Sequence, residues 1–285
     1  MEEVEFNLRN LQLVELEILK EFIKICKILN LRYFMAGGSV LGAVRHNGFI
    51  PWDDDIDIIM PREDYDKFLQ KGQALMQEKY FLQTYETDPE YTMGYAKIRN
   101  SETTFIENST KNLNINHGIF IDVFPLDGYK PEQKIRNLIK KEKYRLYSMQ
   151  IDKKYYTDHK SKSFKGKIGR IISDIIYGRK SIHQLLMKKE KIAKKYKYDE
   201  SNFICPFFDP VKEPLALVFP KTYFEDGILR KFEDIEVIIP KNYDAFLKQH
   251  YGDYMKLPPE KDRMPHHYNQ IIDLKRGYKN YINLK

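Results

Sequence analysis

The segment that decides the fold is residues 37–57, which read GGSVLGAVRHNGFIPWDDDID. Two glycines and a serine follow the apolar run 31–36, so they are expected to end a strand and open a short helix over about 40–45. An acidic run then leads into a second strand, expected over 55–60, in which acidic and aliphatic residues alternate. A glycine turn and an acidic strand therefore lie close together in the sequence.

Two carboxylates of the acidic run are predicted to share one face of the second strand. Because alternate side chains of a strand point the same way, Asp55 and Asp57 should project together while Ile56 points into the core. Neighbouring carboxylates repel each other unless a cation lies between them, and Mg²⁺ prefers oxygen ligands and leaves positions free for phosphate oxygens. Asp53 and Asp54 would deepen the negative field. The alternative is an Asp-rich turn that happens to precede a strand.

A third carboxylate, Asp122, interrupts the apolar run 119–124. A lone carboxylate there would be costly to bury unless it were paired or bound to a metal; the alternative is an edge-strand position that faces water. We favour burial, and we predict Asp55, Asp57 and Asp122 as metal ligands and catalytic residues.

The glycine turn is predicted to bind phosphate through Gly37, Gly38 and Ser39. Backbone N–H groups at a helix start form an anion site, and glycine lets a phosphate approach closely. An ordinary glycine turn is the alternative. The turn and the acidic run together are more specific than either one alone.

Five further side chains are candidates for substrate binding. Arg45 and His46 follow the predicted helix and offer a bidentate fork and a hydrogen-bond donor to phosphate. Lys97 and Arg99 alternate on an expected strand, so both could face a diphosphate. Trp52 offers an aromatic face to a cation. The alternatives are a structural loop histidine, a solvated strand face and a core tryptophan. Three residues near the C-terminal end are candidates for closing the site, with an exposed loop as the alternative: Arg263, His266 and His267.

The composition predicts a single cytoplasmic domain over residues 1–285. The hydrophobic fraction of 42% can supply a core, and no apolar stretch approaches the length needed to cross a bilayer. The acidic start lacks the features of a signal peptide. The two cysteines, Cys26 and Cys205, are far apart and lack metal-ligand spacing, which fits a reducing compartment.

Charge is distributed unevenly along the chain. Residues 130–198 hold 22 Lys/Arg and 6 Asp/Glu, a balance of +16, and the remainder carries −9. We predict a basic helical insertion over 130–200. Within it, residues 164–177 place six apolar side chains on one helix face: Phe164, Ile168, Ile171, Ile172, Ile175 and Ile176. Lys165, Lys167 and Arg170 fall off that face. The simplest interpretation is a helix packed on the domain; the others are attachment to anionic lipid and binding to nucleic acid.

Residues 37–57 strongly resemble the LicD family, which includes bacterial phosphocholine transferases and is related to the fukutin proteins. Further family signatures are PREDY at 61–65, IDVFPLDG at 121–128, YGDYM at 251–255 and the proline pair at 258–259. The resemblance covers about 12–130 and 230–268. The basic middle segment carries no diagnostic match.

The resemblance implies an α+β nucleotidyltransferase-like fold, a mixed sheet flanked by helices. It implies transfer of phosphocholine from CDP-choline to a sugar hydroxyl of a lipid-linked teichoic acid or other polysaccharide precursor, with release of CMP. The residues matching Asp55, Asp57 and Asp122 would hold Mg²⁺, and Asp122 would suit a general base. A peripheral position at the inner membrane surface fits such an acceptor.

Two other functions use the same motif. A nucleotidyltransferase would move NMP from an NTP and release pyrophosphate. A nucleic-acid-binding protein could have kept the fold, but it would have no reason to keep all three carboxylates, so we expect no nucleic-acid partner.

Overall fold

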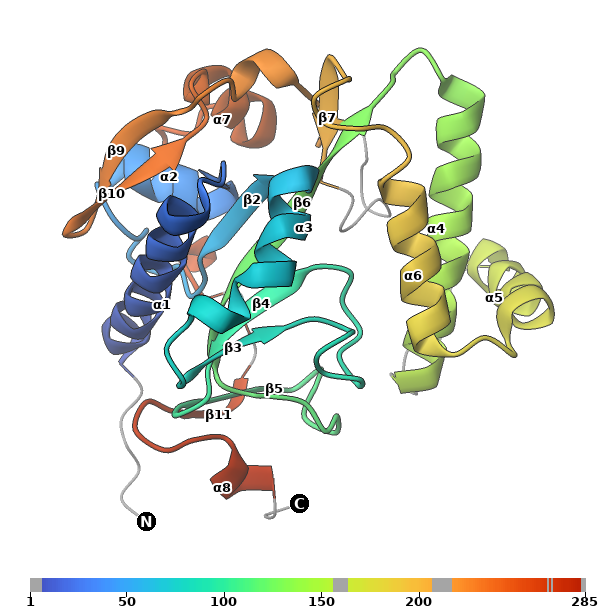
Figure 1. Cartoon of the computed structure of the whole chain (residues 1–285), viewed down its shortest axis with the longest axis horizontal. Helices are drawn as coiled ribbons and strands as arrows, with labels where there is room; N and C mark the ends of the chain where they lie inside the picture. The colour runs from blue at the N-terminus through green and yellow to red at the C-terminus, as the bar shows by residue number, and fades with distance from the viewer. Residues whose placement is uncertain (1–6, 156–163, 207–216, 266, 268, 283–285) are drawn as a thin grey trace.

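The computed structural model describes residues 7–155, 164–206, 217–265, 267 and 269–282 (Figure 1). Its centre is a seven-stranded mixed sheet in which five strands run in the order β1-β2-β6-β4-β3, while β7 and β8 extend the C-terminal part of β6. The strands are β1 (Phe34–Met35), β2 (Asp57–Pro61), β3 (Tyr80–Gln83), β4 (Ala96–Asn100), β6 (Ile119–Tyr129), β7 (Phe203–Cys205) and β8 (Phe219–Pro220). Two antiparallel pairs accompany it: β5 (Thr104–Glu107) with β11 (Asn269–Asp273), and β9 (Ile228–Phe232) with β10 (Ile235–Ile239). The predicted mixed sheet flanked by helices is confirmed.

The central strand is β6, and all of its residues are buried. Its first half lies between β2, to which it is parallel, and β4, to which it is antiparallel. The register places Asp57 of β2 and Lys97 of β4 on either side of Asp122. Strand pairing therefore brings together three charged residues that are far apart in the sequence.

Helices cover the sheet and its β1–β2 edge. The helices α1 (Leu8–Leu29) and α3 (Arg62–Lys71) lie against one face, while α2 (Gly37–Arg45) packs with α7 (Tyr243–Tyr251) beside β2 (Figure 1). Apolar residues recur at three- and four-residue steps over residues 8–29, which predicts a helix with the bounds that α1 has, and Asn30 is a residue type that can cap its C-terminal end. Asn30 adopts a left-handed φ of 50° and ends the helix.

The expected helical character of residues 130–200 is confirmed by α4 (Lys134–Tyr155), α5 (Phe164–Tyr177) and α6 (Ile182–Ala193), which stand beside the sheet (Figure 1). A capping box between Ser181 and Gln184 starts α6. The same helix carries Glu190, which accepts hydrogen bonds from Arg62 of α3 and from the Tyr85 hydroxyl. These polar contacts join α6 to α3 and to the segment that follows β3.

The isoleucine face of α5 does not pack on the domain, so the simplest interpretation of that face was wrong. The described isoleucines of this face are exposed, and α5 packs on α4 through its opposite side, where Ser173 is fully buried. That side carries small residues that allow close approach, which the apolar pattern alone does not reveal. The side chains of Phe164, Lys165 and Lys167 lie outside the described residues.

Several element bounds differ from the sequence expectations. The strand β2 begins at Asp57 rather than Asp55, because its ladder starts where the N–H of Asp122 donates to the carbonyl of Ile56. The helix α2 begins at Gly37 rather than Val40. Pro61 suits the first turn of a helix and predicts one over about 61–78, but α3 ends at Lys71. The strands β7 and β11 were not predicted, because each is defined by a distant partner strand.

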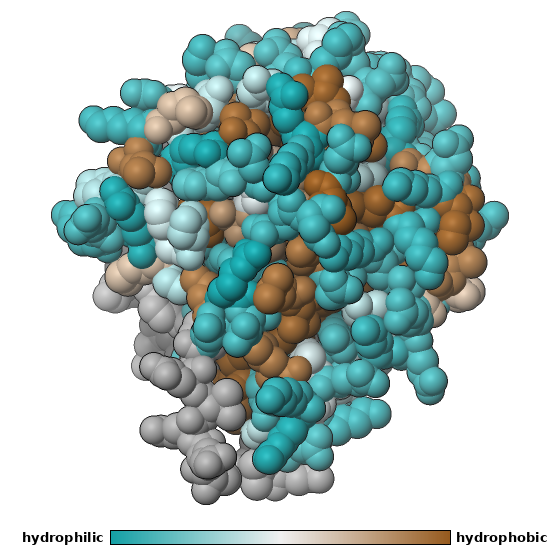
Figure 2. Space-filling view, turned by 90° about the vertical axis from the view of Figure 1, so that its left-hand side faces the viewer, coloured by the Kyte–Doolittle hydropathy of each residue, from teal (hydrophilic) through white to brown (hydrophobic). Residues whose placement is uncertain are grey.

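None of the described helices has the length and apolar character needed to cross a bilayer. Figure 2 shows the face that is on the left in Figure 1, where hydrophilic residues dominate and groups of hydrophobic residues interrupt them. The remaining elements are the 3₁₀ turns Gln73–Leu75, Lys221–Tyr223 and Glu260–Asp262 and the short helix α8 (Lys279–Ile282).

Candidate active site

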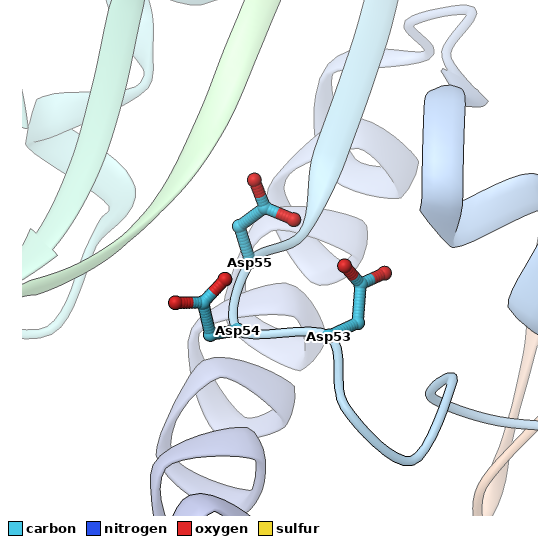
Figure 3. A group of neighbouring side chains, drawn as sticks. All are labelled: Asp53, Asp54 and Asp55. Carbon is cyan, nitrogen blue, oxygen red and sulfur yellow. The ribbon is translucent and has the colours of Figure 1, made fainter. Parts of the chain in front are cut away.

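Three aspartates lie together on the loop that leads into β2. The carboxylates of Asp53, Asp54 and Asp55 project from this loop with oxygen atoms within 4.8 Å of one another (Figure 3). The helix α1 holds the loop, because Gln12 Nε2 donates to the carbonyl of Asp53 at 2.9 Å and to that of Ile50 at 3.3 Å. The sequence assigned Asp53 and Asp54 supporting roles, yet with Asp55 they form a group close enough to share one metal ion.

The glycine turn lies directly against these carboxylates. A Cβ atom on Gly38 would lie 2.6 Å from Asp53 Oδ2, and one on Gly37 would lie 2.8 Å from Asp57 Oδ2. Gly37 also has a φ of +49°, which disfavours other residues. Ser39 is buried beneath the turn, where its hydroxyl accepts the N–H of Asp57 at 3.0 Å. The glycines thus face the site, whereas Ser39 positions Asp57.

A cavity of about 520 Å³ opens in front of the turn. Its acidic end is formed by Asp53, Asp55 and Asp57 beside the two glycines. Much of the remaining lining is aromatic, and this aromatic wall comprises Trp52, Phe124, Phe219, Phe246, Tyr251 and Tyr254. Arg45 and Lys256 add positive charge. The cavity therefore combines an anionic end, a glycine cradle, cations and an aromatic wall.

Asp122 is buried beside the acidic loop and faces a second, smaller cavity of about 60 Å³. Its Oδ1 lies 2.7 Å from Lys97 Nζ, which in turn lies 3.4 Å from the centroid of the Phe120 ring. The predicted need of this buried carboxylate for a charged partner is met in the structure by Lys97. Of the three predicted metal ligands, Asp55 and Asp57 line the large cavity and Asp122 the small one.

Arg99 shares the strand face of Lys97 but is fully buried. Its Nε donates to Gln83 Oε1 at 2.6 Å, and its Nη1 donates to the carbonyl of Gly118 at 2.7 Å. It lines the small cavity together with Lys97. The strand alternation was therefore right about the shared face, but that face meets the protein interior rather than the large cavity.

Arg45, His46 and Trp52 form one connected group. Arg45 Nη1 donates to the carbonyl of Tyr254 at 2.7 Å, and its Nε donates to His46 Nε2 at 2.9 Å. The His46 ring meets the Trp52 ring edge-on, with centroids 6.3 Å apart. Burial and the adjacent Arg45 lower the pKa of His46. The Arg263 guanidinium lies over the Trp52 ring, 5.5 Å from its centroid, so this aromatic face already binds a cation.

His267 joins the site from the segment that precedes β11. Its backbone N–H donates to Asp54 Oδ2 at 2.9 Å, and its Nδ1 lies 3.3 Å from Asp54 Oδ1. Burial lowers the pKa of His267, but the hydrogen bond to Asp54 and the charge of Asp55 outweigh it, and the net pKa is raised. His266, the neighbouring candidate, lies outside the described residues.

The carboxylates of the acidic end resist ionisation. Burial, followed by the charges of Asp55 and Asp54, raises the pKa of Asp53 to about 8. Burial also raises the pKa of Asp55, and burial with the charges of Asp55 and Asp122 raises that of Asp57 further. The surrounding protein does not supply enough positive charge to balance these carboxylates. A bound cation would supply it.

A further acidic residue near this group was missed from the sequence. Glu15 of α1 is buried, its Oε2 has no hydrogen-bond partner among the residues that the structure describes, and burial and the charges of the loop aspartates raise its pKa well above the usual value. It falls on the apolar stripe of α1, between Leu11 and Ile18. The sequence did contain a signal for this residue, because a glutamate on the apolar face of a predicted helix is unusual.

This arrangement fits a divalent cation. Three carboxylates converge, the pKa values of the acidic end are raised, and the buried Glu15 Oε2 is unpartnered. Oxygen-rich sites of this kind suit Mg²⁺, which takes carboxylate and phosphate oxygens together. The fold and the site define a mixed α/β protein with a carboxylate-rich, glycine-bounded cavity.

Comparison with known proteins assigns the family. Residues 30–168 match the family described as LicD/FKTN/FKRP, nucleotidyltransferase domain. The chain is 33% identical over 272 residues to the lipopolysaccharide cholinephosphotransferase LicD of Haemophilus influenzae, covering 94% of this chain and 98% of that protein. It is also 40% identical over 48 residues to the human ribitol 5-phosphate transferase FKRP, covering 17% of this chain and 10% of that protein. The chain belongs to the LicD family, and this membership supports a transferase activity.

Proposed function

We propose that this chain is a nucleotidyltransferase-fold enzyme that transfers phosphocholine from CDP-choline to a sugar hydroxyl of a cell-surface polysaccharide precursor, such as a lipopolysaccharide or teichoic acid precursor. The observation that carries the proposal is the carboxylate group held against the glycine turn at one end of the large cavity. The activity named for the Haemophilus influenzae relative supplies the phosphocholine group. A lipid-linked precursor would place the enzyme at the cytoplasmic membrane face.

In the proposed reaction the sugar oxygen attacks the phosphorus of the phosphocholine group. The bond from that phosphorus to the CMP oxygen breaks, CMP leaves, and a phosphodiester forms. Asp55, Asp57 and Asp122 would hold Mg²⁺, which would neutralise the diphosphate and the leaving CMP. The backbone of Gly37 and Gly38 would approach the phosphates.

Two carboxylates are candidates for the base that accepts the sugar proton. Asp122 is one of the proposed metal ligands, and its pairing with Lys97 anchors its side chain. Asp53 lines the large cavity as a member of the carboxylate group, so it is a second candidate by position. Asp53 is therefore proposed as a general base in addition to Asp122, which was the candidate from the sequence.

The aromatic wall suits the quaternary ammonium group. Trp52 already binds the Arg263 guanidinium, and Tyr251 reaches the glycine turn, where its hydroxyl would lie 3.8 Å from a Cβ on Gly37. A choline head group over an aromatic face gains about 0.5–2 kcal/mol. Arg45 and Lys256, on the same cavity, would offset the charge of the nucleotide phosphates.

The leaving group tests the proposal. With CDP-choline, Mg²⁺ and a polysaccharide precursor, the wild type should release CMP, and Asp55→Asn and Asp57→Asn should each abolish release while remaining folded by circular dichroism. Asp234→Asn, an exposed aspartate paired with Lys20 on the β9–β10 turn, is the matched control and should keep wild-type activity. Consumption of an NTP with release of pyrophosphate, or CMP release by both site variants, would overturn the proposal.

A further inference from the structure

The helix α5 presents a continuous apolar stripe to solvent. The five described isoleucines recur at three- and four-residue steps, so they share one face. Their exposed fractions are 42% for Ile168, 60% for Ile171, 41% for Ile172, 79% for Ile175 and 54% for Ile176. Single exposed isoleucines are ordinary, but a stripe of five on one helix marks a binding surface.

The opposite face of α5 already accounts for its packing within the domain. The Ser173 hydroxyl donates to the carbonyl of Leu146 at 2.8 Å, and Asp174 accepts from Gln150 Nε2 at 2.5 Å and Lys153 Nζ at 2.6 Å. Gly169 approaches the Arg145 guanidinium so closely that a Cβ there would lie 2.8 Å from Nη1. The isoleucine face is therefore not required to attach α5 to α4.

The helix α4 carries a second exposed apolar group. Ile135, Leu138 and Ile139 lie within one helical turn, and each is at least half exposed. Leu138, Glu142 and Arg145 share a face at four- and three-residue steps, and Arg145 meets α5 at Gly169. The exposed residues of α4 thus lie along the side of α4 that leads to α5.

The segment that carries these apolar residues is strongly basic. Residues 130–198 carry a balance of +16, whereas the rest of the chain carries −9. Exposed basic side chains of α4 include Lys134, Arg136, Lys143, Lys153 and Lys154. An exposed apolar helix face on a basic segment combines the two features by which peripheral proteins bind anionic bilayers, namely insertion of apolar side chains and attraction to acidic head groups.

We propose that the isoleucine face of α5, with the exposed apolar residues of α4, binds the surface of a bilayer that contains anionic lipid. The charge selects this occupant, because a second copy of the same basic surface would be repelled. The inference rests on exposure and charge, and it holds whichever group the enzyme transfers. It would bring the catalytic cavity to a lipid-linked acceptor.

Vesicle co-sedimentation of the full chain tests this surface. Wild-type protein should bind phosphatidylglycerol-containing vesicles, and binding should weaken with salt and on pure phosphatidylcholine vesicles. The double variant Ile171→Ser/Ile175→Ser should bind at least about tenfold more weakly, because two apolar side chains no longer enter the interface. Leu229→Ser, which removes an exposed apolar side chain (58%) from β9 on the far side of the molecule, should bind as the wild type does.

Three outcomes would overturn the inference: no binding of the wild type to anionic vesicles, equal binding of the double variant, or wild-type self-association that the double variant abolishes in sedimentation velocity. Circular dichroism confirms that both variants fold. CMP release onto a detergent-solubilised acceptor should stay unchanged in the double variant, so loss of vesicle binding is distinguishable from failure of the proposed chemistry.

Discussion

Gly38 is placed where any side chain would meet the Asp53 carboxylate, because a Cβ there would lie 2.6 Å from Oδ2. Gly38→Ala should displace that carboxylate and reduce kcat/KM on the order of 100-fold, since misplacing a catalytic group by about 1 Å can cost this much. Stability should change little, because alanine favours the helix by about 1 kcal/mol and offsets part of the strain. Steady-state CMP release and thermal unfolding measure the two effects.

The control for this substitution is Gly94→Ala. Among the described residues, a Cβ on Gly94 would meet only the Tyr144 hydroxyl, at 3.9 Å, which is an ordinary contact. Gly94→Ala should therefore retain wild-type kcat/KM. Equal activity of Gly38→Ala and Gly94→Ala would show that Asp53 and the turn need not approach each other so closely.

The buried carboxyls Glu15 and Asp53 predict an unusual dependence of stability on pH. Their folded pKa values are raised, to about 8 for Asp53, while unfolded carboxyls titrate near 4. Between these values the folded chain binds more protons than the unfolded chain, so its free energy of unfolding falls as pH rises from about 4 to about 8. In EDTA, the Tm should therefore be lower at pH 8 than at pH 6.

Two variants on α1 separate this effect from general acid or base sensitivity. Glu15→Gln removes the buried charge, so it should be more stable than the wild type at pH 8 and should show a weaker pH dependence. Glu17→Gln alters an exposed glutamate that pairs with Lys20, and it should follow the wild type. A wild-type Tm that rises between pH 6 and pH 8 in EDTA would contradict the prediction.

At the residue scale, sequence reasoning found the acidic run and the glycine turn but not their partners. Asp122 was singled out because an aspartate in an apolar strand needs a partner, yet its pairing with Lys97 depends on the register of β4 and β6. Glu15 was missed because the apolar pattern of α1 could be described without it. Local patterns identify unusual residues, whereas long-range pairing decides what they contact.

At the scale of elements, the buried pair Arg62–Asp127 ties the start of α3 to the C-terminal part of β6. Arg62 Nε and Nη2 donate to the two Asp127 oxygens at 2.7 and 2.6 Å, and Asp127 is fully buried. Arg62→Ala should destabilise the fold by about 3–5 kcal/mol, because it leaves an unpaired buried carboxylate. Denaturant unfolding followed by circular dichroism measures the loss.

Arg32 provides the matched comparison, since it also pairs with two carboxylates, Asp64 and Asp199, but its side chain is 43% exposed. Arg32→Ala should cost about 1 kcal/mol or less, because exposed ion pairs are screened by water. If both variants lost the same stability, burial would not be the reason for the importance of Arg62.

The element bounds show where sequence patterns fail. The bounds of α1 follow from its apolar spacing and from Asn30, which are local features. In contrast, β6 runs five residues beyond the expected 119–124, because its last part pairs with β7 near residue 204. The exposed face of α5 is a similar case. Its period predicts a helix, but the period does not say which face meets the rest of the protein.

At the scale of the whole molecule, the chain combines a sheet with an acidic cavity and a basic helical lobe fixed to it by α6. Glu190 of α6 contacts Arg62 and Tyr85, and Lys194, which follows α6, pairs with Asp66 of α3 at 3.1 Å. These contacts join the lobe to α3, the helix that packs on β2 and β6. The proposed membrane surface is therefore connected to the site through packed elements.

The donor can be identified by its effect on the stability of the whole chain. A ligand at 100 times its Kd adds about 2.7 kcal/mol to the free energy of unfolding, which raises the Tm of a chain of this size by roughly 5–10 °C. With Mg²⁺ present, CDP-choline should give a larger shift than CMP, CDP-ethanolamine or CDP-ribitol, because the aromatic wall favours a quaternary ammonium group. Trp52→Leu should reduce the CDP-choline shift toward that of CMP and leave the CMP shift unchanged. A larger shift with CDP-ribitol than with CDP-choline would contradict the choice of CDP-choline as donor. It would indicate a ribitol phosphate donor instead, in line with the name of the ribitol 5-phosphate transferase that the chain resembles over 48 residues.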